Sequence, residues 1–304
     1  MKFSIITASF NPGDKLLFTV NSILEQEFQD FEIIVKDGGS KDGALELLKK
    51  NAAAGRAIAE GKLRLIIERD RNVYDGMNQA LEACCRGEYV LFLNCGDRFH
   101  DRSVLGAVAG AIGKAAQTVE KQTEKVSSDI TGETGDAVEE QYGEKNRPVI
   151  YYGNTYCMRT NATVHSAPEI TGFTCFRNIP CHQSCFYDRR LFLEKKYDTN
   201  LKIRADYDHF LWCYYRGGAG FQYLDFVVAD YEGGGISETE KNRKTDKAEH
   251  GLVIRRYMKT GEILKYKGIM LLTLAPLRRW IAESSRFSGV YHRIKSCLYR
   301  KTNL

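Results

Sequence analysis

Four short apolar runs divide the first 113 residues, and the stretches between them carry apolar residues at helical spacing. The runs are Phe3–Thr7, Phe31–Val35, Leu63–Ile67 and Tyr89–Leu93. Short apolar runs that alternate with helical segments are typical of buried parallel strands with crossover helices. The pattern therefore predicts an α/β fold with a mostly parallel sheet and helices on both faces. Ligands bind such sheets at the carboxyl ends of the strands.

The same spacing predicts where helices begin. Asp14 is expected to cap a helix that reaches Leu24, and further helices are expected from about Asp75 and from Asp101. Residues 114–147 interrupt this rhythm with a polar stretch that is rich in glycine, serine, threonine and charged residues. We expect this stretch to be either a mobile insertion or a long solvated helix and loop, without a chemical role.

Regular patterning returns in the second half of the chain at Val149. A helix is expected over residues 206–215, a strand over 221–228, and mostly helix from Lys241 onward. We therefore expect one domain over residues 1–240, followed by a basic helical extension over 241–304.

Composition excludes several classes of protein. A hydrophobic fraction of 43% with only five prolines excludes a collagen-like or largely disordered chain. Apolar runs fall short of the roughly 20 residues that cross a bilayer, and no secretory signal precedes the first strand, so a cytoplasmic location is expected. The nine cysteines are an odd number and favour free thiols over a disulfide framework.

Charge is distributed unevenly along the chain. Residues 241–304 contain 16 Lys and Arg but 4 Asp and Glu, a net charge of +12, whereas the rest of the chain carries −7. A basic extension with interspersed apolar residues, as over 264–287, is typical of peripheral contact with an anionic membrane. A helix that keeps its charges in water is the alternative. The acidic body and the lack of a known module argue against nucleic acid.

Acidic residues follow three successive strands of the expected sheet. Asp37, Asp70 and Asp97 come directly after the second, third and fourth runs. Since parallel strand ends converge on one crevice, these carboxylates are expected to lie near a common ligand. There they could bind a base or ribose, or hold a divalent cation against a diphosphate. Turn formation is the plain alternative for any one of them.

Segments around these residues share their order and character with a known family. They are Phe3–Asn11, Ile33–Gly43, Glu68–Asn78, Tyr89–Asp97, Cys181–Ser184, Ala205–Asp208 and Gly233–Ser237. Together they span residues 3–240 apart from the polar insertion. The chain resembles the family 2 glycosyltransferases with the GT-A fold, in a branch that makes bacterial polysaccharides.

The resemblance implies roles on the donor side of an active site. Ser9 and Phe10 fall in the nucleotide-contacting loop, and Asp37 is expected to read the nucleobase. Three residues belong to the segment that follows the ribose and diphosphate, namely Asp70, Tyr74 and Asn78. Arg71 is a candidate for stabilising diphosphate charge.

Two motifs depart from the family pattern. The metal motif Asp-x-Asp is here Cys95-Gly96-Asp97, so that Asp97 alone is left to bind Mg²⁺ or Mn²⁺, and the diphosphate and water must complete the coordination shell. The usual Glu-Asp is Ala205-Asp206, which leaves Asp206 as the expected general base and Asp208 as a second candidate. His182 and Gln183 are further candidates for contacts with the diphosphate or the acceptor.

We therefore expect an inverting glycosyltransferase that moves a sugar from a nucleotide-sugar donor to a hydroxyl of a lipid-linked or growing surface glycan, with a UDP-sugar as the expected donor. Because each of the two acidic motifs keeps only one of its two acidic residues, a second interpretation stays open, namely a non-catalytic subunit that binds nucleotide or glycan. A nucleotidyltransferase is disfavoured because the first strand is not followed by a basic, glycine-rich loop.

Overall fold

The computed structural model describes residues 1–126, 147–235 and 239–272, and the chain divides into two compact units, Met1–Val253 and Ile254–Leu304. Residues 127–146 of the expected insertion lie outside the described residues. So do residues 236–238 of the glycine-rich loop and residues 273–304 of the basic extension. The boundary between the units falls 13 residues after the one expected at 240, so the first unit includes most of the first helix of the basic extension.

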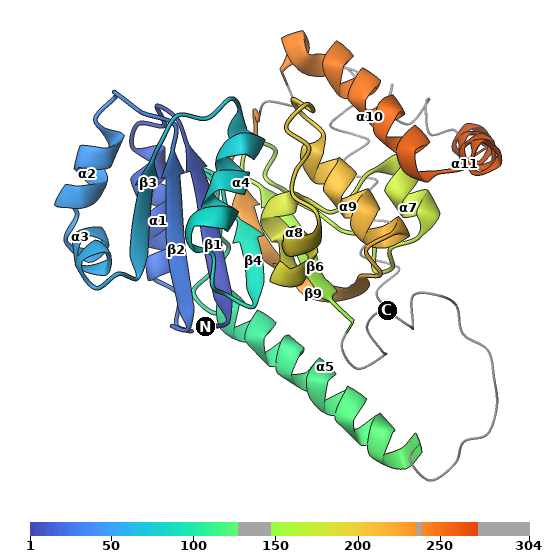
Figure 1. Ribbon diagram of the computed structural model, residues 1–304, viewed down its shortest axis with the longest axis horizontal. Coiled ribbons are helices and arrows are strands. Elements are labelled where there is room, and N and C mark those ends of the chain that lie inside the picture. Colours follow the sequence, from blue (N-terminus) through green and yellow to red (C-terminus); the bar gives the residue numbers. More distant parts are fainter. Residues whose placement is uncertain (127–146, 236–238, 273–304) are drawn as a thin grey trace. The chain divides into compact units, whose positions relative to one another are not determined.

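The expected parallel strands form one half of a nine-stranded sheet in the first unit (Figure 1). In sheet order they are β3 (Leu63–Ile67), β2 (Phe31–Asp37), β1 (Phe3–Ser9) and β4 (Tyr89–Phe92). Every adjacent pair of these four strands is parallel. Their carboxyl ends therefore lie along the same edge, which confirms the expected geometry.

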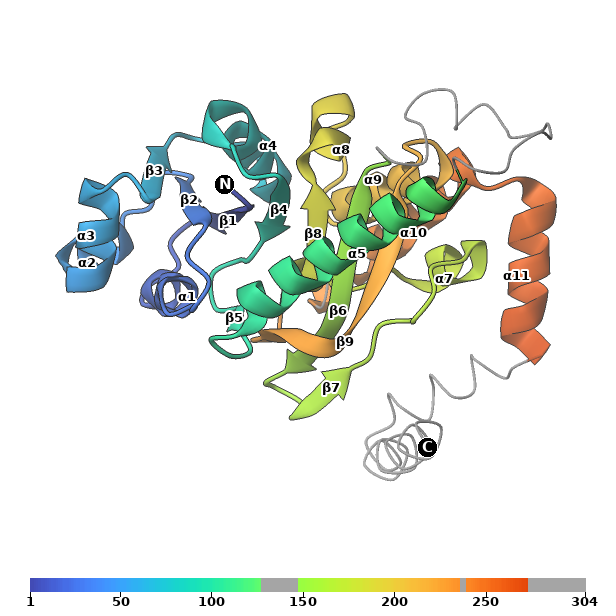
Figure 2. The same cartoon turned by 90° about the horizontal axis from the view of Figure 1, so that it is seen from below.

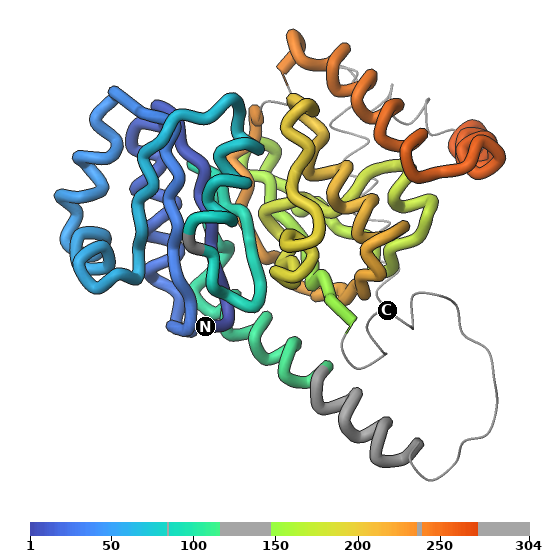
Figure 3. Tube along the Cα trace, in the orientation of Figure 1, coloured from blue at the N-terminus to red at the C-terminus, as the bar shows by residue number. Residues whose placement is uncertain are grey.

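The other half of the sheet is mixed. Beyond β4 come β8 (Cys185–Asp188), β6 (Val149–Cys157), β9 (Gly220–Tyr231) and β5 (Arg98–Phe99), while β7 (Ala162–Val164) pairs with β6. β4 pairs with β8 and β8 with β6 in antiparallel register, and β6 pairs with β9 in parallel. In the trace of Figure 3 the blue-to-cyan first half and the green-to-orange second half of the chain form opposite sides of this unit.

Helices cover both faces of the sheet, as expected. Seen from below, α1 (Lys15–Leu24) lies on one face, and α4 (Val73–Cys84) and α8 (Arg189–Glu194) lie on the other (Figure 2). The remaining helices of this unit are α2 (Ala44–Lys50), α3 (Ala52–Ala59), α5 (Val104–Val126), α7 (Gly172–Arg177) and α9 (Ala205–Tyr215), with short 3₁₀ turns η2 (His182–Ser184) and η4 (Glu240–Asn242).

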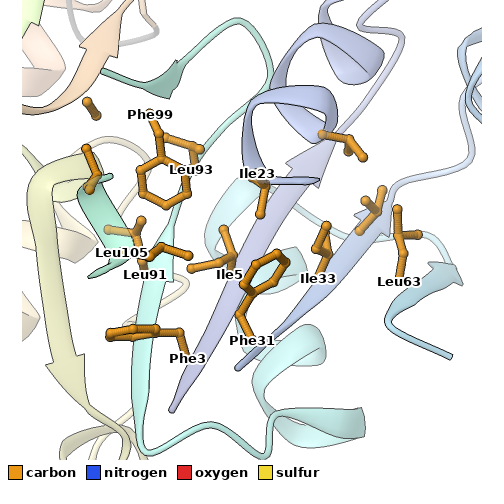
Figure 4. Close-up of a cluster of buried hydrophobic side chains, with 14 of the residues drawn as sticks. Phe3, Ile5, Ile23, Phe31, Ile33, Leu63, Leu91, Leu93, Phe99 and Leu105 are labelled. Carbon is orange, nitrogen blue, oxygen red and sulfur yellow. The ribbon is translucent and has the colours of Figure 1, made fainter. Parts of the chain in front are cut away.

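The core forms where the apolar faces of strands and helices meet. Phe3, Ile5, Ile33 and Leu91 are fully buried and form one apolar cluster with Ile23 of α1 (Figure 4). Burying a large aliphatic or aromatic side chain stabilises the fold by about 1.5–3 kcal/mol. This packing fixes the position of the strands relative to the helices, and therefore the position of the loops that follow the strands.

Three helix starts differ from the sequence-based expectation, and one of them is that of α5, which begins at Val104 instead of Asp101. Asp14 precedes α1, but its backbone is already helical and its side chain makes no capping hydrogen bond. α4 begins at Val73, two residues before Asp75, because the Asn72 side chain accepts the backbone N–H groups of Tyr74 and Asp75. An asparagine in extended conformation is a favourable N-cap, which sets this boundary.

In the second unit the described residues are helical, as the basic extension was expected to be. They comprise the end of α10 (Arg243–Tyr257), which begins in the first unit, and α11 (Thr260–Leu272). None of the helices within residues 1–126, 147–235 and 239–272 is long and apolar enough to cross a membrane.

Candidate active site

A cleft of about 810 Å³ opens at the carboxyl ends of the parallel strands. Its walls come from the loops after β1, β3 and β4, from the turn at His182, from the segment before α9 and from the loop after β9. Of the residues singled out from the sequence, those that line it are Ser9, Phe10, Asp70, Arg71, Tyr74, Asp97, His182 and Asp206. Residues more than 190 positions apart in the chain therefore meet at one site.

Asp37 is fully buried next to Ser9 and does not line the cleft. Its carboxylate accepts the Ser9 hydroxyl, the Ser40 hydroxyl and the backbone N–H groups of Gly39 and Ser40. Burial raises the pKa of Asp37, but these hydrogen bonds outweigh it and hold the pKa below its usual value. Its observed contacts orient Ser9 and the turn after β2.

Asp70 is held at the cleft by a buried cation. The Lys36 ammonium is fully buried and lies 2.9 Å from Asp70 Oδ2. It also donates to the backbone carbonyls of Asp37 and Glu68. A buried lysine needs such partners because the unpaired charge would be costly to desolvate. Asp70 Oδ2 also lies 3.0 Å from where a Cβ would stand on Gly38 or on Gly76, so small residues at both positions admit the carboxylate.

Phe10 presents an aromatic ring to this side of the cleft. Its side chain is 67% exposed although it is a large apolar group. The exposed ring gives a flat surface on which a heterocycle can stack. Arg71 also lines the cleft, but its guanidinium pairs with Asp75 and reaches Thr199 Oγ1.

Asp97 forms a buried acidic corner with the loop after β9. Its Oδ1 accepts the backbone N–H of Glu232 at 3.0 Å, and only 4% of the residue is exposed. Burial raises the pKa of Asp97 to about 7, and the Glu232 carboxylate acts in the same direction. Glu232 in turn pairs with Lys15 at 2.6 Å. Its Oε2 lies 2.3 Å from where a Cβ on Gly96 would stand, so a side chain at position 96 would clash with this carboxylate.

Asp206 lines the cleft from the first turn of α9. The Tyr74 hydroxyl lies 3.1 Å from Asp206 Oδ1 and 2.5 Å from the carbonyl oxygen of Ile203. Burial raises the pKa of Tyr74 well above its usual value, so this hydroxyl stays protonated and donates. His182 Nδ1 lies 3.7 Å from Asp206 Oδ2.

The orientation of His182 follows from its second nitrogen. The Asn94 side-chain amide lies 3.1 Å from His182 Nε2 and donates to it, which leaves the ring proton on Nδ1, facing Asp206. Burial lowers the pKa of His182, and the Asp206 carboxylate opposes that shift. The His182 side chain beside Asp206 is therefore a neutral imidazole near neutral pH.

Three other candidates lie outside the cleft. Asn78 is buried, and its amide exchanges two hydrogen bonds with the backbone of Tyr197, a residue that does line the cleft. Gln183 is buried away from the cleft. Asp208 is fully buried in an ion pair with Lys195. Asp206 is thus the one of the two α9 carboxylates that faces the cleft.

Sequence reasoning missed several residues of the lining. They are Lys15, Asn94, Tyr197, Lys202 and Glu232. Glu232 directly precedes the three glycines at 233–235, and this position next to a recognisable loop could have marked it. Asn94 lies in the segment Tyr89–Asp97, which carries part of the family resemblance. Lys15, Tyr197 and Lys202 carry no local pattern, since only the fold brings them to the cleft.

Comparison with known proteins agrees with this geometry. The family described as "Glycosyl transferase family 2" matches residues 4–169. A PGL/p-HBAD biosynthesis glycosyltransferase of Mycobacterium tuberculosis is 30% identical over 288 residues, which cover 93% of each chain. The putative teichuronic acid biosynthesis glycosyltransferase TuaG of Bacillus subtilis is 31% identical over 96 residues, 32% of this chain and 36% of TuaG.

Two solved structures share the fold at lower identity. S. aureus TarS 1–349 in complex with UDP superimposes with a TM-score of 0.57 at 17% identity, over 95% of this chain and 74% of the TarS chain. The mannosyltransferase PcManGT from Pyrobaculum calidifontis, in complex with GDP-Man and Mn²⁺, gives a TM-score of 0.55 at 16% identity, over 97% and 80%. These likenesses show a GT-A-like α/β fold. With the family match and the full-length relative, they establish that the chain belongs to glycosyl transferase family 2 and is a glycosyltransferase.

Proposed function

We propose that this glycosyltransferase moves a sugar from a UDP-sugar to the hydroxyl of a lipid-linked or growing bacterial glycan, with inversion at the anomeric carbon. The observation that carries the proposal is the cleft itself. It places the exposed ring of Phe10, the carboxylate of Asp97 and the carboxylate of Asp206 around one cavity. An aromatic ring can stack on a nucleobase, and a carboxylate can hold a divalent cation against a diphosphate. A second carboxylate can accept the proton of an attacking hydroxyl.

The donor would lie along the ends of the parallel strands. The Phe10 ring would stack on the base, with Ser9 and Asp70 beside it as polar contacts. Asp37 and Asn78 would support this wall from behind, through Ser9 and through Tyr197. A uridine donor is favoured because solved structures of TarS, which share the fold, contain UDP or UDP-GlcNAc.

Asp206 would act as the general base. Its carboxylate lines the cleft and is held by Tyr74, with the His182 ring beside it. An acceptor hydroxyl would give its proton to Asp206 as its oxygen forms a bond to the anomeric carbon and the bond to the diphosphate breaks. A single displacement of this kind inverts the anomeric carbon.

The residues at Asp97 fit a divalent cation such as Mg²⁺ or Mn²⁺. Carboxylate oxygens are the ligands these ions prefer, and Asp97 and Glu232 bring two carboxylates to the same corner. Among residues 1–126, 147–235 and 239–272 no group of three or more metal-ligating side chains occurs, so the diphosphate would complete the shell. When bound, the cation would stabilise negative charge on the departing diphosphate. Lys15 and Asn94 would line the same corner.

The acceptor proposal rests on the relatives and on the basic extension. The relatives are named for PGL/p-HBAD and teichuronic acid biosynthesis. In α11, exposed Leu264, Leu271 and Leu272 occur with Lys265 and Lys267. Such a surface would hold a cytoplasmic enzyme at an anionic inner-membrane face, with each basic residue contributing about 1 kcal/mol.

A donor screen tests the proposal. The full chain would be incubated with UDP-, GDP-, dTDP- and CDP-sugars in Mg²⁺, Mn²⁺ or EDTA, and released nucleoside diphosphate would be counted. Cation-dependent release from a UDP-sugar is expected, with an inverted anomeric centre in the product. UDP binding without release from any donor, even with added lipid-linked acceptors, would instead favour a non-catalytic binding subunit.

A further inference from the structure

Helix α10 contacts the segment that leads into α9 through one polar face. Asp246, Glu249 and His250 lie three and four residues apart, so they share a side of the helix. Each of them contacts the segment from 202 to 207. The proposed base, Asp206, belongs to that segment. Residues 243–253 are part of the first unit, so these contacts lie within one compact body.

Glu249 receives three successive backbone donors. Its Oε1 accepts the N–H of Lys202 at 2.9 Å, and its Oε2 accepts the N–H groups of Ile203 and Arg204 at 2.9 and 3.0 Å. Consecutive N–H groups that converge on one anion form a strong, charge-assisted contact. The residue before α9, Arg204, offers no side-chain cap of its own. Glu249 therefore supplies from 45 residues away an acceptor that the local sequence lacks.

We infer that Glu249 is a positioning residue for Asp206, an inference that rests on the proposed function. The backbone donors it holds end two residues before Asp206. Within residues 202–204, the carbonyl of Ile203 accepts the same Tyr74 hydroxyl that lies against the Asp206 carboxylate. Glu249 thus sets the backbone at 202–204, and that backbone sets the distance between Tyr74 and Asp206.

Asp246 provides a matched comparison on the same helix. It binds the Arg204 guanidinium through both oxygens, at 2.6 and 3.0 Å. His250 stacks on Tyr207 with ring centroids 5.0 Å apart. These two residues contact the side chains of Arg204 and Tyr207, whereas Glu249 binds the backbone N–H groups of residues 202–204. Asp246→Asn should therefore loosen α10 without removing the acceptor for residues 202–204.

The experiment compares Glu249→Gln, Glu249→Asp and Asp246→Asn in the full chain. Glutamine offers one acceptor oxygen and turns an N–H₂ group toward the donors, so amide hydrogen exchange over 202–206 should be at least tenfold faster in Glu249→Gln. Release of UDP from UDP-GlcNAc at saturating donor should fall at least tenfold, while the Kd for UDP stays within threefold. Asp246→Asn should change the rate of UDP release less than threefold. The rate of Glu249→Asp should lie between that of Glu249→Gln and that of the native chain, nearer the native value.

A double variant separates this inference from the proposed function. If Glu249 acts through Asp206, then Glu249→Gln should lower UDP release less than twofold in an Asp206→Asn background. An equal tenfold loss in both backgrounds would overturn the positioning role and leave Asp206 as the base. Unchanged exchange at 202–206, or native release by Glu249→Gln, would also overturn it. Native release by Asp206→Asn would instead refute the proposed base.

Discussion

The two walls of the cleft are built in different ways. The donor wall comes from consecutive strand ends, and its polar groups are held by neighbours on adjacent strands, such as Lys36 for Asp70. The base wall carries Asp206 on a helix whose supporting contacts come from Tyr74 and from Glu249. The donor wall is therefore fixed by sheet register, whereas the base wall depends on contacts between distant parts of the chain. Substitutions in the two walls should consequently have separable effects.

The largest effect is expected at the base. Replacing Asp206 with asparagine removes the proton acceptor and should lower turnover by about 10²–10⁴-fold. The affinity for UDP should stay within threefold because the donor wall is untouched. Turnover and UDP titration would be measured on the same preparation, with Asp225→Asn as a control because Asp225 is exposed and does not line the cleft. If Asp206→Asn lost as much UDP affinity as turnover, the effects of the two walls would not be separable.

The next largest effect is expected at the acidic corner. Chelation of divalent cations, or Asp97→Asn, should lower turnover by about 100-fold, since bound cations contribute several kcal/mol to stabilising transition-state charge. Unlike the loss at Asp206, the loss caused by chelation should be reversed by added Mn²⁺ in the native chain. Glu25→Gln serves as the carboxylate control, because Glu25 is exposed and pairs with Arg102 at the surface. Full activity in EDTA would show that no cation acts at this corner.

A smaller effect is expected at the stacking surface. Loss of one aromatic platform costs about 1–3 kcal/mol of base stacking, so Phe10→Ala should weaken UDP binding about tenfold. Turnover at saturating donor should remain within twofold of the native value. Phe18→Ala is a matched control because Phe18 is also exposed but does not line the cleft. If Phe10→Ala lowered turnover and left UDP affinity intact, the ring would not be a donor contact.

The smallest effect concerns stability at low pH. The pKa of Asp37 is lower in the folded chain than in the unfolded one, so its stabilising effect is present above the unfolded value and is lost as pH falls through the folded value. The free energy of unfolding of the native chain should therefore fall more steeply below about pH 4 than that of Asp37→Asn. Urea unfolding at pH 7, 4 and 3 measures the two slopes. Identical slopes would contradict the bonding of Asp37 by Ser9 and Ser40.

The first half of the fold was predictable because its signals are local. Apolar runs fix the strands, parallel pairing fixes which ends converge, and Asp70 and Asp97 therefore meet at the cleft as expected. Asp37 occupies an equivalent strand end, yet its carboxylate faces Ser40 and the turn. The orientation of a carboxylate at a strand end depends on which hydrogen-bond donors surround it in the folded chain. Its position in the sequence does not specify those donors.

The roles of residues 243–253, by contrast, could not be predicted from local signals in the sequence. Their basic composition suggested an extension that begins at 241, whereas their acidic residues Asp246 and Glu249 hold the segment before α9. Net charge averages over a stretch and conceals the few side chains that make contacts. Glu232 is similar, because it reaches the acidic corner only through the pairing of β9 with β5, next to Asp97.

The sequence by itself determined the α/β fold, the positions of the first four strands along the chain and the family resemblance, because the hydrophobic period and the residues at strand ends are local features. The tertiary structure decided which of two α9 carboxylates faces the cleft, which strand-end carboxylate is bonded by its own turn, and what holds the base. Those outcomes depend on distances between residues tens to hundreds of positions apart, such as Tyr74 with Asp206. Only the packed chain sets such distances.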